Sequence, residues 1–203
     1  MKSIILATAL SALATTALAQ TKPNNAAPAT QSGAQQSGTQ GQQAQITSPA
    51  TQRFMQKTAI TDLFEIQSGQ LAQQKAQGDE YKQFGEMIFT DHTKTSQQLK
   101  GMAQNMPGAQ MGELDAAHKQ KLEKLQSLSG AKFDAEFKTE QVKGHQDAIK
   151  LFQDYAQKGD LPDLKKFAQD TLPTLQQHLQ HAQSLPKESD AATVGSGSSK
   201  KKR

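Results

Sequence analysis

The chain has 203 residues, of which 34 % are apolar and 5 % aromatic, and it contains no cysteine. This apolar fraction is low for a globular domain, and the lack of cysteine excludes disulfides, thiolate metal ligands, a cysteine nucleophile and a lipidated cysteine. The net charge of +4 comes from the ends, because residues 51–186 carry 16 Lys and Arg against 17 Asp and Glu. A nucleic-acid interface needs clustered basic residues on the folded domain, so nucleic acid is excluded as the main partner.

Residues 1–19 have the pattern of a secretory signal. Lys2 precedes an apolar stretch, and Ala17-Leu18-Ala19 is the small-x-small sequence that signal peptidase cleaves. We therefore expect cleavage near Ala19 and a periplasmic or extracellular mature chain. No later segment has the 18 or more consecutive apolar residues of a spanning helix, so we predict no transmembrane span in the mature chain.

Two further segments lack the apolar residues needed for a core. Residues 20–50 are rich in Gln, Ser, Gly and Pro and are predicted to be a disordered linker, and residues 187–203 are predicted to be a disordered basic tail. The tail ends in four basic residues, which favours weak contact with an anionic envelope surface or a simple gain in solubility. The sequence identifies no specific partner.

Residues 51–186 show helical periodicity throughout, so this part is predicted to be one all-α domain. Helices are expected at about 48–76, 79–105, 114–128, 131–158 and 160–186, and Pro173 is expected to kink the last one near Thr171. Four of these segments are long and their connections are short. This predicts an antiparallel four-helix bundle with a short extra connecting helix.

Several short motifs resemble a known family. They are Asp91-His92-Thr93, Ser129-Gly130 followed by Phe133-Asp134, His145 in the fourth helix, and Leu172-Pro173 followed by His178. With their surroundings, residues 54–100 and 128–185, they resemble the bacterial domain of unknown function 4142. The resemblance implies an exported protein with a ferritin-like helical bundle. Its members are often labelled outer-membrane proteins, and it implies no established activity.

The usual di-metal motif of ferritin-like bundles is missing from this sequence. Such sites use Glu-x-x-His on two helices, but Phe89, Val142 and Leu175 stand three residues before His92, His145 and His178. A di-iron oxidase of the usual kind is therefore disfavoured.

Polar residues nevertheless interrupt the apolar stripes at similar heights. In an up-down bundle, Glu65, His92 and His145 all lie near 20 Å along their helices, at about 1.5 Å rise per residue, whereas His178 lies roughly 10 Å lower. The helical spacing also places Glu65 in line with Phe54, Ser68 and Ala72 and not clearly on the main apolar side of its helix. Two interpretations remain. In the first, Glu65, His92, His145 and His178, with Asp91 as a further candidate, bind a divalent transition metal. In the second, the same residues form a buried hydrogen-bonded network, in which Asp91 or Glu65 accepts from imidazole N–H groups, and this network fixes helix register. His118 and His181 are expected to be exposed.

No glycine-rich phosphate loop, Gly-x-Ser-x-Gly elbow or His-Glu-x-x-His motif occurs in the sequence. The inventory therefore favours a protein without catalytic activity and without an obligatory cofactor. We expect an exported helical-bundle protein with an envelope or stress-related role. The alternative is a metal-binding or redox-protective ferritin-like protein.

Overall fold

The computed structural model describes residues 48–186, which lie in one compact unit. All the regular secondary structure of these residues is helical. Its five helices are α1 (Pro49–Lys75), α2 (Asp79–Ala103), α3 (Ala116–Ser127), α4 (Gly130–Lys158) and α5 (Pro162–Ser184). The predicted helices are confirmed with ends within a few residues. The predicted signal, the basic tail and almost all of the predicted linker lie outside the described residues.

Local sequence explains where the helices begin. Ser48 caps α1, because its Oγ accepts a hydrogen bond from the backbone N–H of Thr51 at 3.1 Å, and Pro49 occupies the first helical turn. Asp115 caps α3 in the same way through the backbone N–H of His118 at 2.8 Å. Pro173 lies inside α5, which continues through it as a single helix.

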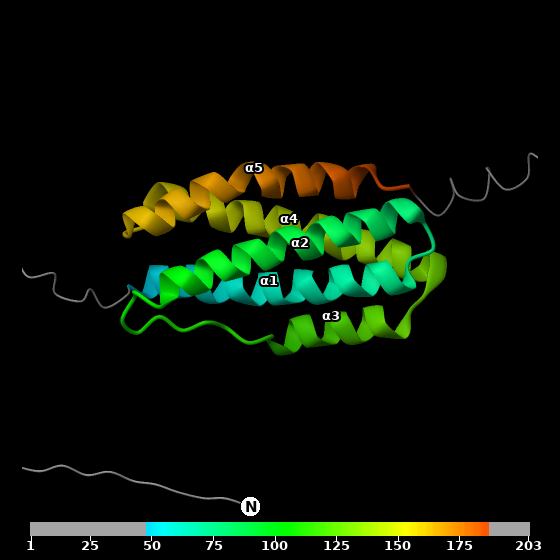
Figure 1. Cartoon of the computed structure of the whole chain (residues 1–203), viewed down its shortest axis with the longest axis horizontal. Helices are drawn as coiled ribbons and strands as arrows, with labels where there is room; N and C mark the ends of the chain where they lie inside the picture. Colours follow the sequence, from blue (N-terminus) through cyan, green and yellow to red (C-terminus); the bar gives the residue numbers. More distant parts are fainter. Residues whose placement is uncertain (1–47, 187–203) are drawn as a thin grey trace, which may run out of the picture. The chain divides into compact units, whose positions relative to one another are not determined.

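The chain reverses direction at each connection between successive helices (Figure 1). α1 and α2 are antiparallel, as are α4 and α5, since only short turns join each pair. Between these pairs, residues 104–115 and α3 carry the chain back along the length of the domain, so that α4 begins at the same end as α2 (Figure 1). α1 and α5 each pack against both α2 and α4, and α3 packs outside, against α1 and α4.

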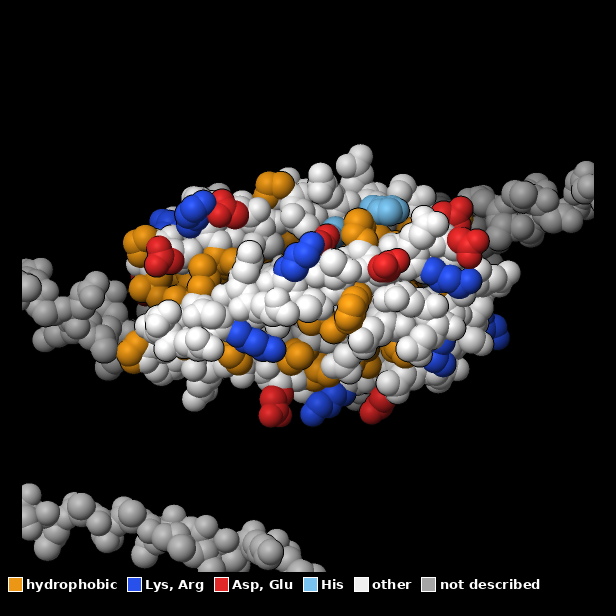
Figure 2. Space-filling model, viewed as in Figure 1, with side chains coloured by type: hydrophobic (Ala, Val, Ile, Leu, Met, Phe, Trp, Pro, Cys, Tyr) orange, Lys and Arg blue, Asp and Glu red, His pale blue; other side chains and the backbone are white. Residues whose placement is uncertain are grey.

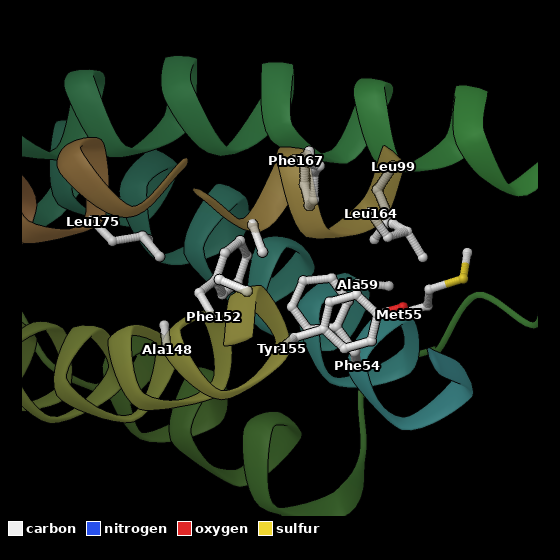
Figure 3. Close-up of a cluster of buried hydrophobic side chains, with 12 residues drawn as sticks. Phe54, Met55, Ala59, Leu99, Ala148, Phe152, Tyr155, Leu164, Phe167 and Leu175 are labelled. Atoms are coloured by element: carbon white, nitrogen blue, oxygen red, sulfur yellow. The ribbon is translucent and has the colours of Figure 1, made fainter. Parts of the chain in front are cut away.

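The core contains two apolar clusters. Figure 3 shows the first, in which Phe54 stacks on Tyr155 with ring centroids 4.1 Å apart and meets the Phe152 edge at 5.1 Å. The second is built around Phe84, Phe133 and Phe137. Along each of the four long helices, the two clusters are separated by buried polar residues. This polar layer comprises Asp62, Glu65, His92, Gln141, His145 and His178.

Two contacts fix how α1 and α2 meet. The Asp134 carboxylate on α4 accepts hydrogen bonds from the backbone N–H groups of Gln77 and Gly78, at 3.1 and 3.0 Å, and so ties down the turn between these helices. Gly69 and Gly85 let the helices cross closely. A Cβ at Gly69 would lie 2.6 Å from the carbonyl oxygen of Gly85, which is too close for any side chain.

Two features describe the outside of the domain. The face shown in Figure 2 carries basic and acidic side chains interspersed. None of the five described helices has an apolar stretch long enough to cross a bilayer.

Candidate metal centre

Three histidines from three helices converge in the polar layer. His92 of α2, His145 of α4 and His178 of α5 are 3 %, 1 % and 2 % exposed. Their ring centroids form a nearly equilateral triangle with sides of 5.6, 5.5 and 5.2 Å. One ring nitrogen of each lies within 4.8 Å of the others. Residues separated by more than 30 positions in sequence therefore present three nitrogens to one point.

The other nitrogen of each ring has its own hydrogen-bond acceptor. His92 Nδ1 lies 2.8 Å from Asp62 Oδ1 on α1, and His178 Nε2 lies 3.1 Å from Asp91 Oδ2 on α2. His145 Nδ1 donates to the backbone carbonyl of Gln141 at 2.9 Å. Carboxylates and carbonyls in this position orient metal-binding imidazoles and fix the tautomer that leaves the inner nitrogen free to bind.

The contact between His145 and His178 shows the effect of these acceptors. His145 Nε2 lies 3.2 Å from His178 Nδ1. Three contacts each need one N–H group: the contact with the Gln141 carbonyl, the contact with Asp91 and the contact between the rings. Two neutral imidazoles carry only two N–H groups. If both outer contacts are donated, two lone pairs face each other. A bound cation removes this conflict, because both lone pairs then point at the ion.

Burial and neighbouring charges together determine the pKa values of the three rings. Burial lowers the pKa of His145 well below its usual value and that of His178 to about 4, with a further contribution from the neighbouring His92. Burial also acts to lower the pKa of His92, but the hydrogen bond and charge of Asp62, with Glu65 and Asp91, raise it overall. His145 and His178 are therefore neutral at physiological pH, which is the form that binds metal.

His92 Nε2 is the third inner nitrogen. It is buried and has no hydrogen-bond partner among residues 48–186. Buried polar atoms are nearly always paired, so an orphan nitrogen that faces two other ring nitrogens points to a ligand.

Glu65 lies in the same layer but outside the triad. It is 1 % exposed, and its Oε2 accepts a hydrogen bond from Gln141 Nε2. A Cβ at Gly144 would lie 3.1 Å from Glu65 Oε1, so the glycine leaves room for this carboxylate. Burial raises the pKa of Glu65. Of the four residues that the sequence suggested as ligands, the structure brings the three histidines together and places Glu65 beside them.

Two arguments from the sequence about these positions were wrong. His178 lies at the level of the other histidines. The chain returns along the domain through α3, so α4 runs in the direction of α2. As a result, α5 begins at the end where α1 begins (Figure 1). The helical phase of Glu65 is not that of an exposed residue, since Phe54, Ser68 and Ala72 on the same side are also buried.

Other residues of the layer were missed or misjudged. Asp62 and Gln141 were not proposed as site residues, and both are buried. Asp62 lies three residues before Glu65 and Gln141 lies four residues before His145. This spacing puts each on the same helix face as a candidate and was the available signal. Asp91, a further candidate ligand in the metal interpretation, lies behind His178 and accepts its outer hydrogen bond. His181 is exposed as expected, whereas His118 is half-buried with its ring 5.4 Å from that of Phe64.

The geometry suits a transition-metal ion. In a tetrahedral centre with metal–nitrogen bonds of 2.0–2.1 Å, neighbouring ligand nitrogens are about 3.4 Å apart. The distance between His145 Nε2 and His178 Nδ1 is 3.2 Å. Neutral imidazoles suit zinc, copper, iron and nickel, and the carboxylates of Asp62 and Asp91 behind two of the ligands balance the charge of a dication.

Comparison with known proteins places the chain in a family without assigning an activity. No curated protein matches the chain, and no solved structure matches it. The model of one protein family, described as Domain of unknown function (DUF4142), matches residues 34–185. The chain therefore belongs to the DUF4142 family.

Proposed function

We propose that this protein binds one divalent transition-metal ion through His92, His145 and His178. The observation that carries the proposal is the convergence of three buried ring nitrogens within 4.8 Å, while the outer nitrogen of each ring is held by Asp62, Gln141 or Asp91. Such outer hydrogen bonds are typical of histidines that bind metals.

The proposed fold is a ferritin-like four-helix bundle in which α3 belongs to the long crossover. Support comes from the order of the helices, because ferritin-like bundles have one long crossover connection, and here residues 104–115 with α3 join α2 to α4. The ligand set differs from the two-metal sites of such bundles, because three histidines and no Glu-x-x-His are present. We therefore propose one metal ion per chain.

We further propose that the protein works outside the cytoplasm, in the periplasm or beyond. The signal-like residues 1–19 support this, and the lack of cysteine suits an exported chain held together by packing. An envelope or stress-related role follows if the site holds metal that would otherwise be harmful, or takes part in protection against oxidants. The hydrogen-bonded network without metal is the interpretation that competes with this proposal.

The direct test is a metal titration of the mature chain without a histidine tag. After chelator treatment, the chain is titrated separately with Zn²⁺, Cu²⁺, Co²⁺ and Ni²⁺ in a calorimeter. We expect at least one of these ions to bind with a stoichiometry of one. His145→Ala and His178→Ala should each weaken binding by at least about tenfold, since loss of one ligand removes a metal–nitrogen bond.

His118→Ala is the matched control. His118 is a half-buried histidine that belongs to another contact, with Asp115 and Phe64, and its loss should leave binding unchanged. Equal binding by the parent chain and His145→Ala, or no binding by the folded parent, would reject the metal site. In the second case the network interpretation would stand.

A further inference from the structure

Three methionines gather at the end of the bundle where α1 begins. Met102 lies in the last turn of α2, and Met106 and Met111 follow it in residues 104–115 (Figure 1). All three are partly buried, and each packs against the first apolar cluster. Together with Ala109, Met106 and Met111 are the apolar side chains through which residues 104–115 contact that cluster.

The backbone of residues 104–115 contributes little to holding this segment against the other helices. Its hydrogen-bonded N–H groups donate to carbonyl oxygens three or four residues earlier in the chain, so these bonds do not reach α1 or α4. A side-chain contact to α1, between Gln56 and Gln110, is exposed and long at 3.5 Å. The segment does pass close to α1, because a Cβ at Gly112 would lie 2.7 Å from Ile60 Cγ1. Packing, in which two thioethers take part, therefore holds the segment in place.

A thioether fills an apolar gap well, but it can be oxidised. Hydrogen peroxide transfers one oxygen atom to the sulfur: the O–O bond breaks, an S–O bond forms, the sulfur loses two electrons and water leaves. The sulfoxide is polar, and a polar group held against an apolar surface without a hydrogen-bond donor costs free energy. Oxidation therefore favours a state in which the side chain has left the cluster.

We infer that Met106 and Met111 are modification sites for peroxide, and that their oxidation releases residues 104–115 from the end of the bundle. The two thioethers act as a latch, which is closed when reduced and open when oxidised. Sulfoxides can be reduced enzymatically, so the latch is reversible. It goes beyond the proposed metal site and does not depend on it, because the three histidines lie in the polar layer and not at this end.

The release should stay local, because α3 has anchors of its own. Leu122 and Leu125 are buried in the second apolar cluster, and Lys121 pairs with Glu140 of α4 at 2.7 Å. None of these contacts involves a methionine. We therefore expect the segment before α3 to open while α3 remains on the bundle.

The first experiment measures which sulfurs react. The chelator-treated mature chain is exposed to hydrogen peroxide, and the sulfoxide at each methionine is followed by mass spectrometry of its peptides. Met55 lies in the same cluster but is 0 % exposed, so it serves as the internal control. Met106 and Met111 should be oxidised at least about tenfold faster than Met55, because reactivity follows exposure. Equal rates for the three would overturn the assignment of the modification sites.

The second experiment measures the release. Oxidised and untreated chains are digested with subtilisin, and cleavage within residues 104–114 and within α3 is followed by mass spectrometry. Cleavage tracks the population of the open form, and one unpaired polar group of ordinary cost changes that population by about tenfold. We expect cleavage of the segment to rise by about this factor on oxidation, and to return when both methionine sulfoxide reductases are added. Unchanged cleavage of the oxidised chain would overturn the latch.

Variants separate the latch from general oxidative damage. The double variant Met106→Leu, Met111→Leu keeps apolar side chains of similar size and removes both thioethers, so peroxide should no longer accelerate cleavage of the segment. Met87→Leu, the matched control, changes a partly buried methionine at the second cluster and should respond to peroxide as the parent does. A double variant that still opens on oxidation, or an α3 cleaved as fast as the segment, would contradict a latch at Met106 and Met111.

Discussion

The environment of the Glu65 carboxyl group is very different from that of a glutamate on the surface. It is fully enclosed, its main partner is the neutral amide of Gln141, and the nearby charges come from His92, Asp62 and Lys121. Burial outweighs the favourable contacts and raises its pKa above 4.5. The folded chain therefore holds this proton more tightly than the unfolded chain, and stability falls as the pH rises above that value.

Glu65→Gln should remove this loss. Gln keeps an acceptor oxygen for Gln141 and carries no charge to bury, so the metal-free variant should become more stable relative to the parent as the pH rises from 4.5 to 8. At pH 8 we expect the Tm of the variant to exceed that of the parent by a few degrees, because about 1 kcal/mol shifts Tm by roughly 2–4 °C in a chain of this size. Thermal unfolding of both chains across this pH range measures it, and a gap independent of pH would contradict the argument.

At the scale of the helices, the crossing of α1 and α2 depends on two glycines in contact. Gly69→Ala would place a Cβ 2.6 Å from the Gly85 carbonyl and 3.0 Å from the Phe89 backbone nitrogen, neither of which can move aside alone. The variant should therefore be less stable by about 1–3 kcal/mol, the usual cost of overpacking. Urea unfolding of the metal-free chain provides the measurement.

Gly101→Ala is the control for this substitution. Gly101 also lies inside a helix, but a Cβ there would meet nothing within 4 Å. Alanine at this exposed position should stabilise the chain by about 0.5–1 kcal/mol, because glycine loses more backbone entropy on folding. If both variants changed stability in the same direction, close packing at Gly69 would not be the cause.

The helices themselves could be predicted because each carries its signals locally. Ser48-Pro49 begins α1 and Gly159 ends α4 through contacts within a few residues, so the sequence was sufficient there. The direction in which α4 runs is not a local property. It depends on how residues 104–115 and α3 return along the domain, and this is why the predicted height of His178 was wrong while its membership of the site could still be proposed.

At the scale of the whole molecule, the proposed metal site joins helices that are far apart in sequence. His92, His145 and His178 can meet only when α2, α4 and α5 are packed, so an unfolded chain offers no comparable site. A ligand that binds only the folded state stabilises it by about 2.7 kcal/mol at a concentration of one hundred times Kd. If the three histidines bind a metal as proposed, binding is coupled to the stability of the domain.

This coupling predicts a rise in Tm of about 5–11 °C when the chelator-treated chain receives its metal at that excess. The rise should depend on metal concentration, and at the same metal concentration it should fall to about half or less in His178→Ala, whose binding is expected to be at least about tenfold weaker. Differential scanning calorimetry with and without metal checks both points. A Tm that metal leaves unchanged, in a chain that unfolds cooperatively, would mean that the domain offers no folded-state site.

The sequence could place Glu65, His92 and His145 at a common level but could not choose between ligands and their supports. Glu65 and the histidines are all ionisable residues on buried helix faces, so the sequence gives them the same appearance. Their roles differ only after packing, which pairs Glu65 with Gln141 and brings the three rings face to face. Asp62 was missed for the same reason, because its partner His92 lies 30 residues away. Long-range contacts between side chains decide these roles.

The most direct test of the central claim is anomalous diffraction from crystals of the metal-loaded mature chain, with data collected on both sides of the absorption edge of the bound metal. The account predicts one strong anomalous peak per chain, about 2.0–2.1 Å from a ring nitrogen of each of His92, His145 and His178. A map without a peak in the polar layer, or with its peak at a surface pair such as Asp115 and His118, would contradict it.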